Sequence, residues 1–196
     1  MKRPASENWV LLALVVAGVV CRVAFRGVPN FAPVAAIALF AGYYASSRWI
    51  ATAVPVAILA VSDLFLGGYA WQTMLAVYAL LTLPTFVGHW LQASEGMYPS
   101  STTAKLFRHG ALLLGCSLAP SILFFVFSNL AWWASTSMYE RTWTGLLQCY
   151  SQALPFFRNT LTGDLFFAAV LFGGYSLALA LVKQSQANLV PETVRE

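Results

Sequence analysis

The stretch from Trp49 to Leu66, WIATAVPVAILAVSDLFL, decides the fold class because it is apolar over nearly its whole length. Asp63 is its only charged residue, and Pro55 lies in its interior, where proline kinks a helix. A helix needs about 17–25 predominantly apolar residues to cross a bilayer, and this stretch meets that length. It therefore predicts a membrane-spanning helix with one carboxylate near its end.

Apolar residues dominate the rest of the chain as well. Of its 196 residues, 59% are hydrophobic and 9% are charged, and the mean hydropathy is +0.70. A soluble domain carries about 25% charged residues, so this surface is unsuited to water. The net charge of +4 comes from scattered Lys and Arg, with no basic run, which argues against a nucleic-acid partner. We expect one all-α domain, residues 1–196, integral to the lipid bilayer.

Working outward from Trp49–Leu66, the same criterion predicts six transmembrane helices. They cover Trp9–Phe25, Phe31–Tyr44, Trp49–Leu66, Trp71–Leu91, Leu106–Phe127 and Leu165–Val182. The second is short, so we expect it to be tilted or partly buried in the bundle. The run after Lys2 and Arg3 imitates a signal peptide, but no A-x-A cleavage site follows it, so we interpret it as a retained first helix.

The positive-inside rule orients these helices. An even number of spans places both termini on one side, and the N-in/C-in assignment puts seven basic residues in the cytoplasm and four outside. The inner set is Lys2, Arg3, Arg48, Lys105, Arg108, Lys183 and Arg195; the outer set is Arg22, Arg26, Arg141 and Arg158. We therefore predict a multi-pass protein of the bacterial inner (cytoplasmic) membrane with its termini in the cytoplasm.

A long extracytoplasmic loop is then expected between the fifth and sixth helices, from Ser128 to Gly163. It is too long to be a mere connection. Its aromatic residues include Trp132, Trp133, Tyr139, Trp143 and Tyr150. Periodicity does not reveal whether part of it is helical. It is typical either of a lid over a pocket or of an aromatic belt resting on lipid headgroups.

Polar side chains near the outer ends of the predicted helices form the candidate substrate-binding site. Charge at the edge of hydrocarbon costs a few kcal/mol, so such residues indicate function by default. We select Asn30, Asp63, Asn129, Trp132, Trp133, Asn159 and Asp164.

Each polar member of this set also has a purely structural interpretation. Asp63 is either an ion-pair partner of Arg22, Arg26 or Arg158, or a carboxylate that faces a ligand. Asp164 opens the sixth predicted helix and suits a cap of free backbone N–H groups. The two asparagines at positions 30 and 129 also suit helix caps. Only their shared location at one end of the bundle favours a polar pocket.

Other motifs give little support for catalysis or metal binding. The sequence has no HExxH, GxSxG, Walker A or paired-carboxylate arrangement, and His89 and His109 have no ligand at metal spacing. Cys21, Cys116 and Cys149 form no CxxC, and a Cys21–Cys149 disulfide stays open because sequence alone does not fix pairing. No enzyme activity, metal or cofactor is indicated.

Four sequence runs carry a resemblance. They are Asn30-Phe-Ala-Pro-Val-Ala-Ala-Ile-Ala-Leu-Phe-Ala-Gly42, Ser62-Asp63-x-x-x-Gly67, Phe127-Ser128-Asn129-x-x-Trp132-Trp133 and Pro155-Phe-Phe-x-Asn159-Thr-x-x-Gly163-Asp164. Together they resemble a widespread group of bacterial six-helix membrane proteins of uncharacterised function. That group in turn looks like the substrate-binding S components of energy-coupling factor (ECF) transporters.

The resemblance implies a subunit that binds a small vitamin-like nutrient near the outer face for uptake. It also implies docking on a transmembrane coupling subunit through small residues of the first helix, which Ala13 and Ala17 match, with ATP hydrolysis in separate ATPase subunits. Two alternatives stay open. One is an integral membrane enzyme or assembly factor whose outer aspartates act on a lipid-linked substrate; the other is a structural bundle without a cavity.

Overall fold

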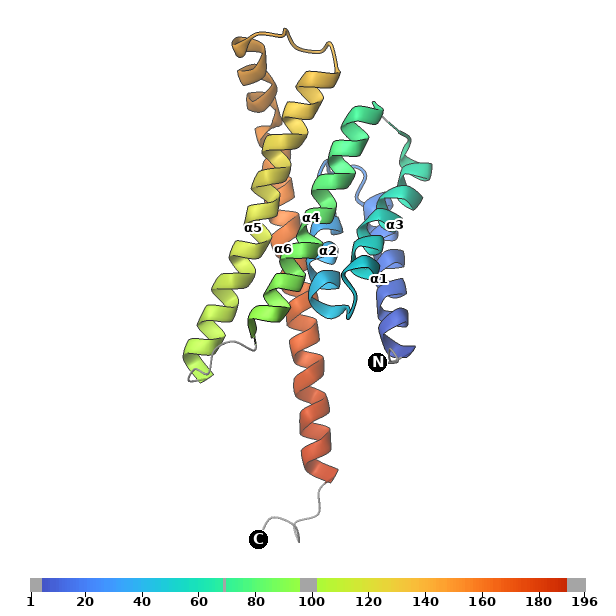
Figure 1. Cartoon of the computed structure of the whole chain (residues 1–196), viewed down its shortest axis with the longest axis vertical. Helices are drawn as coiled ribbons and strands as arrows, with labels where there is room; N and C mark the ends of the chain where they lie inside the picture. The colour runs from blue at the N-terminus through green and yellow to red at the C-terminus, as the bar shows by residue number, and fades with distance from the viewer. Residues whose placement is uncertain (1–4, 69, 96–101, 190–196) are drawn as a thin grey trace.

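The computed structural model of the chain describes residues 5–68, 70–95 and 102–189, and these residues form six α-helices and no strand. The helices are α1 (Ala5–Ala24), α2 (Val34–Tyr44), α3 (Arg48–Leu66), α4 (Trp71–Glu95), α5 (Thr102–Ser135) and α6 (Trp143–Leu189). They run alternately up and down, so that Ala5 and Leu189 lie toward the same end of the bundle (Figure 1). The predicted all-helical class is confirmed.

Five of these helices are long and apolar enough to cross a membrane, and α2 is the exception among the described residues. With 11 residues α2 extends only about 16 Å, roughly half the thickness of the hydrocarbon layer. It is apolar on every face, and its residues from Ala36 to Gly42 are all buried. Of the two expectations for this short helix, tilt or burial, burial in the bundle is confirmed, while the count of six membrane spans stays a prediction. The helices indicate a multi-pass membrane protein, and its sidedness stays a prediction.

Two glycines allow α2 and α4 to pack with their backbones in contact. A Cβ atom on Gly42 would lie 1.9 Å from the carbonyl oxygen of Thr85, and one on Gly88 would lie 2.0 Å from that of Leu39. Real Cβ atoms do not come so close to another atom, so any larger residue forces the helices apart. Small residues allow such close approach of helices in membrane proteins, where packing replaces the hydrophobic drive for association.

The sixth helix is much longer than predicted, because it begins at Trp143 rather than at Leu165. The polar run before Asp164 continues the helix, since its hydroxyls bond to carbonyl oxygens of the same helix. Thr160 Oγ1 donates to the carbonyl of Phe156 and Thr162 Oγ1 to that of Arg158. With α5 continuing to Ser135, only residues 136–142 link the two helices. Most of the expected outer loop is therefore helical.

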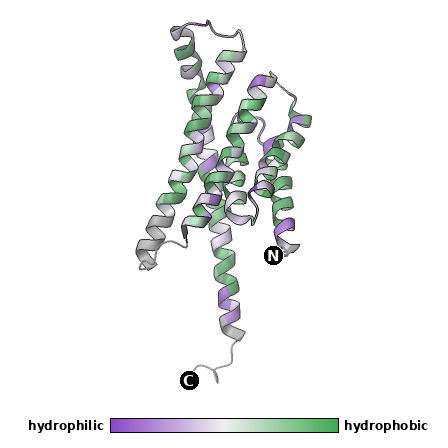
Figure 2. Cartoon of the chain, in the orientation of Figure 1, coloured by the Kyte–Doolittle hydropathy of each residue, from purple (hydrophilic) through white to green (hydrophobic). Residues whose placement is uncertain are grey.

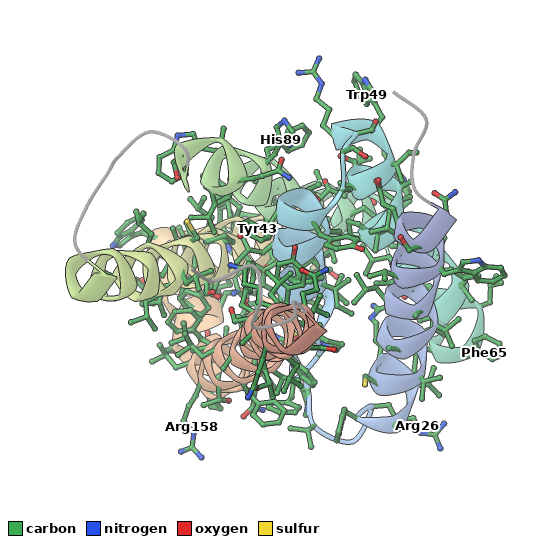
Figure 3. All side chains as sticks on the ribbon, turned by 90° about the horizontal axis from the view of Figure 1, so that it is seen from below. Arg26, Tyr43, Trp49, Phe65, His89 and Arg158 are labelled. Atoms are coloured by element: carbon green, nitrogen blue, oxygen red, sulfur yellow. The ribbon has the colours of Figure 1, made fainter. Side chains whose placement is uncertain are left out.

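Apolar residues make up most of the length of the helices, and hydrophilic residues are sparse along them (Figure 2). Large exposed side chains include Trp49, Leu64, Trp71 and Trp90, as suits a surface in contact with lipid. The lower part of α6 extends beyond the other helices (Figure 1), and its residues from Gly173 to Gln186 are mostly exposed. Seen along the bundle, Tyr43 of α2 lies among the helices, while Trp49, Phe65 and Arg158 extend outward (Figure 3).

Candidate functional site: a cavity at one end of the bundle

A cavity of about 1050 Å³ lies at the end of the bundle opposite the described termini. All six helices contribute to its wall, together with the α1–α2 connection over residues 25–33. Its aromatic lining consists of Phe25, Phe31, Phe65, Phe124, Phe125, Trp132, Tyr139 and Phe156. Its polar lining includes Arg22, Arg26, Asn30, Thr73, Ser128, Asn129, Gln152, Thr160 and Asp164. Small-ligand sites have this make-up of apolar walls with a few polar groups.

Asp164 is the carboxylate of this cavity. It is only 5% exposed, and its Oδ2 accepts a 2.6 Å hydrogen bond from Ser121 Oγ of α5. The interpretation of Asp164 as a helix cap is wrong, because α6 begins at Trp143 and the residue lies far inside the helix. The free backbone N–H groups that a cap would satisfy are absent there.

Asp63 lies outside the residues that line the cavity and is part of an ion pair. Nη1 of Arg22 lies 2.5 Å from Asp63 Oδ1 and donates a second hydrogen bond, also 2.5 Å long, to Ser62 Oγ. The hydroxyl of Tyr78 donates to Asp63 Oδ2 over 2.9 Å. Of the three arginines proposed as partners, Arg22 is the one that pairs with it. Asp63 thus ties α3 to α1 and α4.

The three asparagines of the predicted site differ in where they lie and in what they contact. Asn30 lines the cavity from the α1–α2 connection with a φ of +62°, a left-handed conformation that asparagine adopts more readily than most residues. It does not cap α2, whose N-cap is Pro33. Asn129 also lines the cavity, inside α5 rather than at its end, and its Nδ2 donates to the carbonyl of Phe125. Asn159 lies outside the lining; its Nδ2 holds the carbonyl of Pro29 at 3.0 Å.

The two adjacent tryptophans also differ in whether they line the cavity. Trp132 lines the cavity, whereas Trp133 lies outside the lining and holds the α5–α6 link. Trp133 Nε1 donates to the carbonyl of Glu140 at 2.9 Å, and the guanidinium of Arg141 lies 5.3 Å from the Trp133 ring centre. The structure thus brings Asn30, Asn129, Trp132 and Asp164 together around one cavity, and places Asp63, Trp133 and Asn159 in contacts that support it.

The predicted site set lacks several polar residues of the cavity, among them Ser121, which bonds to Asp164, and Gln152 and Thr160 of the lining. Ser121 follows Pro120 within an apolar span, and a hydroxyl beside a proline was a usable signal. Gln152 and Thr160 lay in the segment that was expected to be loop, where nothing in the pattern fixed their direction. Their helical setting on α6 is what turns them toward the cavity.

Ala13 and Ala17, proposed for partner docking, are exposed on α1. Gly18 points the other way, since a Cβ atom there would lie 2.5 Å from Cδ1 of Ile58 on α3. The small residues of α1 therefore lie on two faces of the helix: Gly18 packs inside the bundle, and Ala13 and Ala17 lie on the exposed face. All three cysteines are free thiols. In the part of the chain that the structure describes, no three His, Cys, Asp or Glu residues group as metal ligands.

One known family model covers nearly the whole chain. The family model described as "Family of unknown function (DUF6580)" matches residues 2–188. The chain belongs to this family. No curated protein and no solved structure matches it.

Proposed function

We propose that this DUF6580 member is a membrane substrate-binding subunit, similar in role to the S components of ECF transporters. It captures a small vitamin-like nutrient from the outer face of the bacterial cytoplasmic membrane. The observation that carries the proposal is the cavity at the end of the bundle away from the described termini. Its volume of about 1050 Å³ lies near the upper limit of about 1,000 Å³ for small-ligand pockets, so a drug-sized molecule fits inside.

The lining suits a partly aromatic nutrient. Phe31, Phe124 and Trp132 offer ring faces and edges for offset or edge-to-face stacking, which adds about 0.5–1.5 kcal/mol per pair beyond area burial. Asn30 and Asn129 add amide groups for orientation, and Asp164 adds a carboxylate. Few polar groups against apolar walls give specificity without a large desolvation cost.

The partner in this proposal is a transmembrane coupling subunit. The face of α1 that carries Ala13 and Ala17 is exposed, and its side chains are small enough for a second helix to pack closely. Separate ATPase subunits supply the energy in this scheme. The sequence has no P-loop of its own to bind ATP.

A thermal-shift screen of the detergent-purified protein against a panel of vitamins tests the proposal. We expect at least one compound to raise the unfolding midpoint, since a ligand at 100 times its Kd stabilises the folded state by about 2.7 kcal/mol. The Ser128→Trp variant, which fills the cavity from α5, should lose this response. The matched Ala134→Trp variant adds the same side chain at an exposed position of α5 outside the lining and should keep it.

Silence of the whole panel, together with failure of any coupling subunit to co-purify, would rule out the proposal. Turnover of a lipid-linked substrate without retention of a small ligand would favour the membrane enzyme or assembly factor instead. A response that both tryptophan variants retain would place the binding site elsewhere on the protein.

A further inference from the structure

Asp164 is a buried acidic group that lacks a cationic partner. In the described part of the chain its carboxylate has one hydrogen bond, from Ser121, and takes part in no ion pair. Buried carboxylates are ordinarily paired with a cation or held by several hydrogen bonds, because removing the charge from water is costly. A hydroxyl alone does not balance a negative charge. The structure therefore leaves this residue incomplete without a further group.

The nearby arginines do not fill that role. Arg22 lines the cavity, but its guanidinium is engaged by Asp63 and by the hydroxyl of Ser62. Arg26 contributes to the cavity wall, but it is exposed and its side chain extends outward at the periphery of the bundle, as does that of Arg158 (Figure 3). No cation of the described chain is thus positioned to pair with Asp164.

The surroundings of Asp164 suit a ligand group rather than bulk solvent. Beside it, Ala35, Pro84 and Pro120 offer no side-chain donor, and the Ser117 hydroxyl and Cys116 thiol of the same small pocket are neutral groups rather than cations. Aromatic rings of Phe31, Phe124 and Phe156 form other parts of the same wall, and ring faces attract positive charge. A cation that enters here exchanges its hydration for a carboxylate and for aromatic faces.

We propose that the ligand of this cavity is an organic cation, a flat ring that bears a protonated nitrogen, whose N–H groups donate to the Asp164 carboxylate. This inference rests on the proposed function and specifies its substrate class. The ring lies against the aromatic wall, and the charged nitrogen completes the buried acidic group. Neutral and anionic nutrients of the same shape are rejected, because they leave Asp164 unpaired or repel it.

Three probes of nearly equal shape test the charge preference: benzamidine, which is a cation at neutral pH, neutral benzamide and anionic benzoate. Binding to the detergent-purified full chain is measured for each by calorimetry or ligand-observed NMR. We expect benzamidine to bind at least about tenfold more tightly than either analogue, as a hydrogen bond to a charged group implies.

Two variants of α6 locate the effect. Asp164→Asn keeps the size of the side chain and removes its charge, and it should abolish the preference for benzamidine. Thr160→Val lies one turn away, also lines the cavity and is also buried, but its hydroxyl bonds only to the carbonyl of Phe156. This control should keep the preference. The unfolding midpoint of each variant shows that the comparison is made between folded proteins.

Benzamide or benzoate binding as tightly as benzamidine would overturn the inference. A preference that survives in Asp164→Asn, or no benzamidine binding at all, would overturn it too. These failures are distinct from failure of the proposed function. If a neutral or anionic vitamin binds and Ser128→Trp blocks its binding, the cavity captures a nutrient but the preference for a cation is wrong. If no vitamin binds but benzamidine still binds selectively, the protein has a cation site but nutrient capture is wrong.

Discussion

The two ends of the bundle are packed differently. Small residues close the lower part around α2 and α4, whereas polar and aromatic residues surround a cavity at the opposite end around α5 and α6. In the first region, which we term the closed region, Gly42 and Gly88 bring the backbones of α2 and α4 into contact. Asp63 lies toward the other end, where Arg22 of the cavity wall neutralises it. In the second, the cavity region, the helices separate around about 1050 Å³ and Asp164 lacks a cation among the described residues. Satisfied groups stabilise a fold, whereas an unsatisfied buried charge indicates a site kept for something else.

The largest effect is expected at the α2–α4 contact. Gly88→Leu places a side chain where even a Cβ atom would meet the carbonyl oxygen of Leu39 at 2.0 Å. Because the obstacle is backbone, the two helices must separate, and we expect loss of folded protein rather than a modest shift. Size-exclusion chromatography in detergent measures this. Gly173→Leu, on an open stretch of α6 with nothing near its Cβ position, is the control and should give a monodisperse protein.

Breaking the ion pair should have the next largest effect. Among the described residues, Arg22→Leu leaves Asp63 with the Tyr78 hydroxyl alone and should lower stability by about 3 kcal/mol, the lower end of the range for a broken buried pair. The double variant Arg22→Leu/Asp63→Leu should regain most of this loss, since an apolar pair of similar volume replaces both charges. The midpoint of thermal unfolding in detergent reports both. If the double variant were no more stable than the single one, the pair would have a role beyond charge balance.

Asp164→Asn should change the stability of the ligand-free protein in the opposite direction to Arg22→Leu. Removing an unpaired buried charge should leave the unfolding midpoint unchanged or raise it by the equivalent of about 1 kcal/mol. The same variant should lose ligand-induced stabilisation. A drop in midpoint as large as that of Arg22→Leu would mean that Asp164 is a structural residue of the folded bundle.

The smallest effect is expected at the α5–α6 link, which closes the end of the cavity region. Trp133→Phe keeps the ring and removes the Nε1 hydrogen bond to the Glu140 carbonyl. Since the contact is partly exposed, we expect a loss of about 1 kcal/mol, seen as faster proteolysis within residues 136–142. Trp143→Phe, at an exposed side chain beyond the link, should leave the cleavage rate unchanged.

Sequence reasoning predicted the features that depend on composition and on local pattern. The helical class and the burial of short α2 follow from apolar length. An ion pair of Asp63 was one of two interpretations, with Arg22, Arg26 and Arg158 all open as its partner, and only the structure identifies Arg22. Sequence reasoning did not predict the start of α6. The polar run from Asn159 to Asp164 is typical of a loop, and only the structure shows its threonine hydroxyls bonded to carbonyls of their own helix.

That single difference changes the interpretation of Asp164. A residue at a helix start has free N–H groups to satisfy it, whereas one in mid-helix must find partners from other helices or from a ligand. No pattern in the sequence distinguishes the two positions. Likewise, Trp132 and Asn129 line the cavity whereas Trp133 and Asn159 do not, and this depends on how each helix is rotated about its axis. Hydrophobic pattern alone does not fix that rotation for helices surrounded by lipid.

The most direct test of the central claim is a density map of the purified protein with the compound that raises its unfolding midpoint most. We expect ligand density inside the cavity, with a nitrogen within hydrogen-bond distance of Asp164 and the ring against Phe31 or Trp132. Density for that compound at another surface, with the cavity closed by side chains, would show that the cavity is not the binding site.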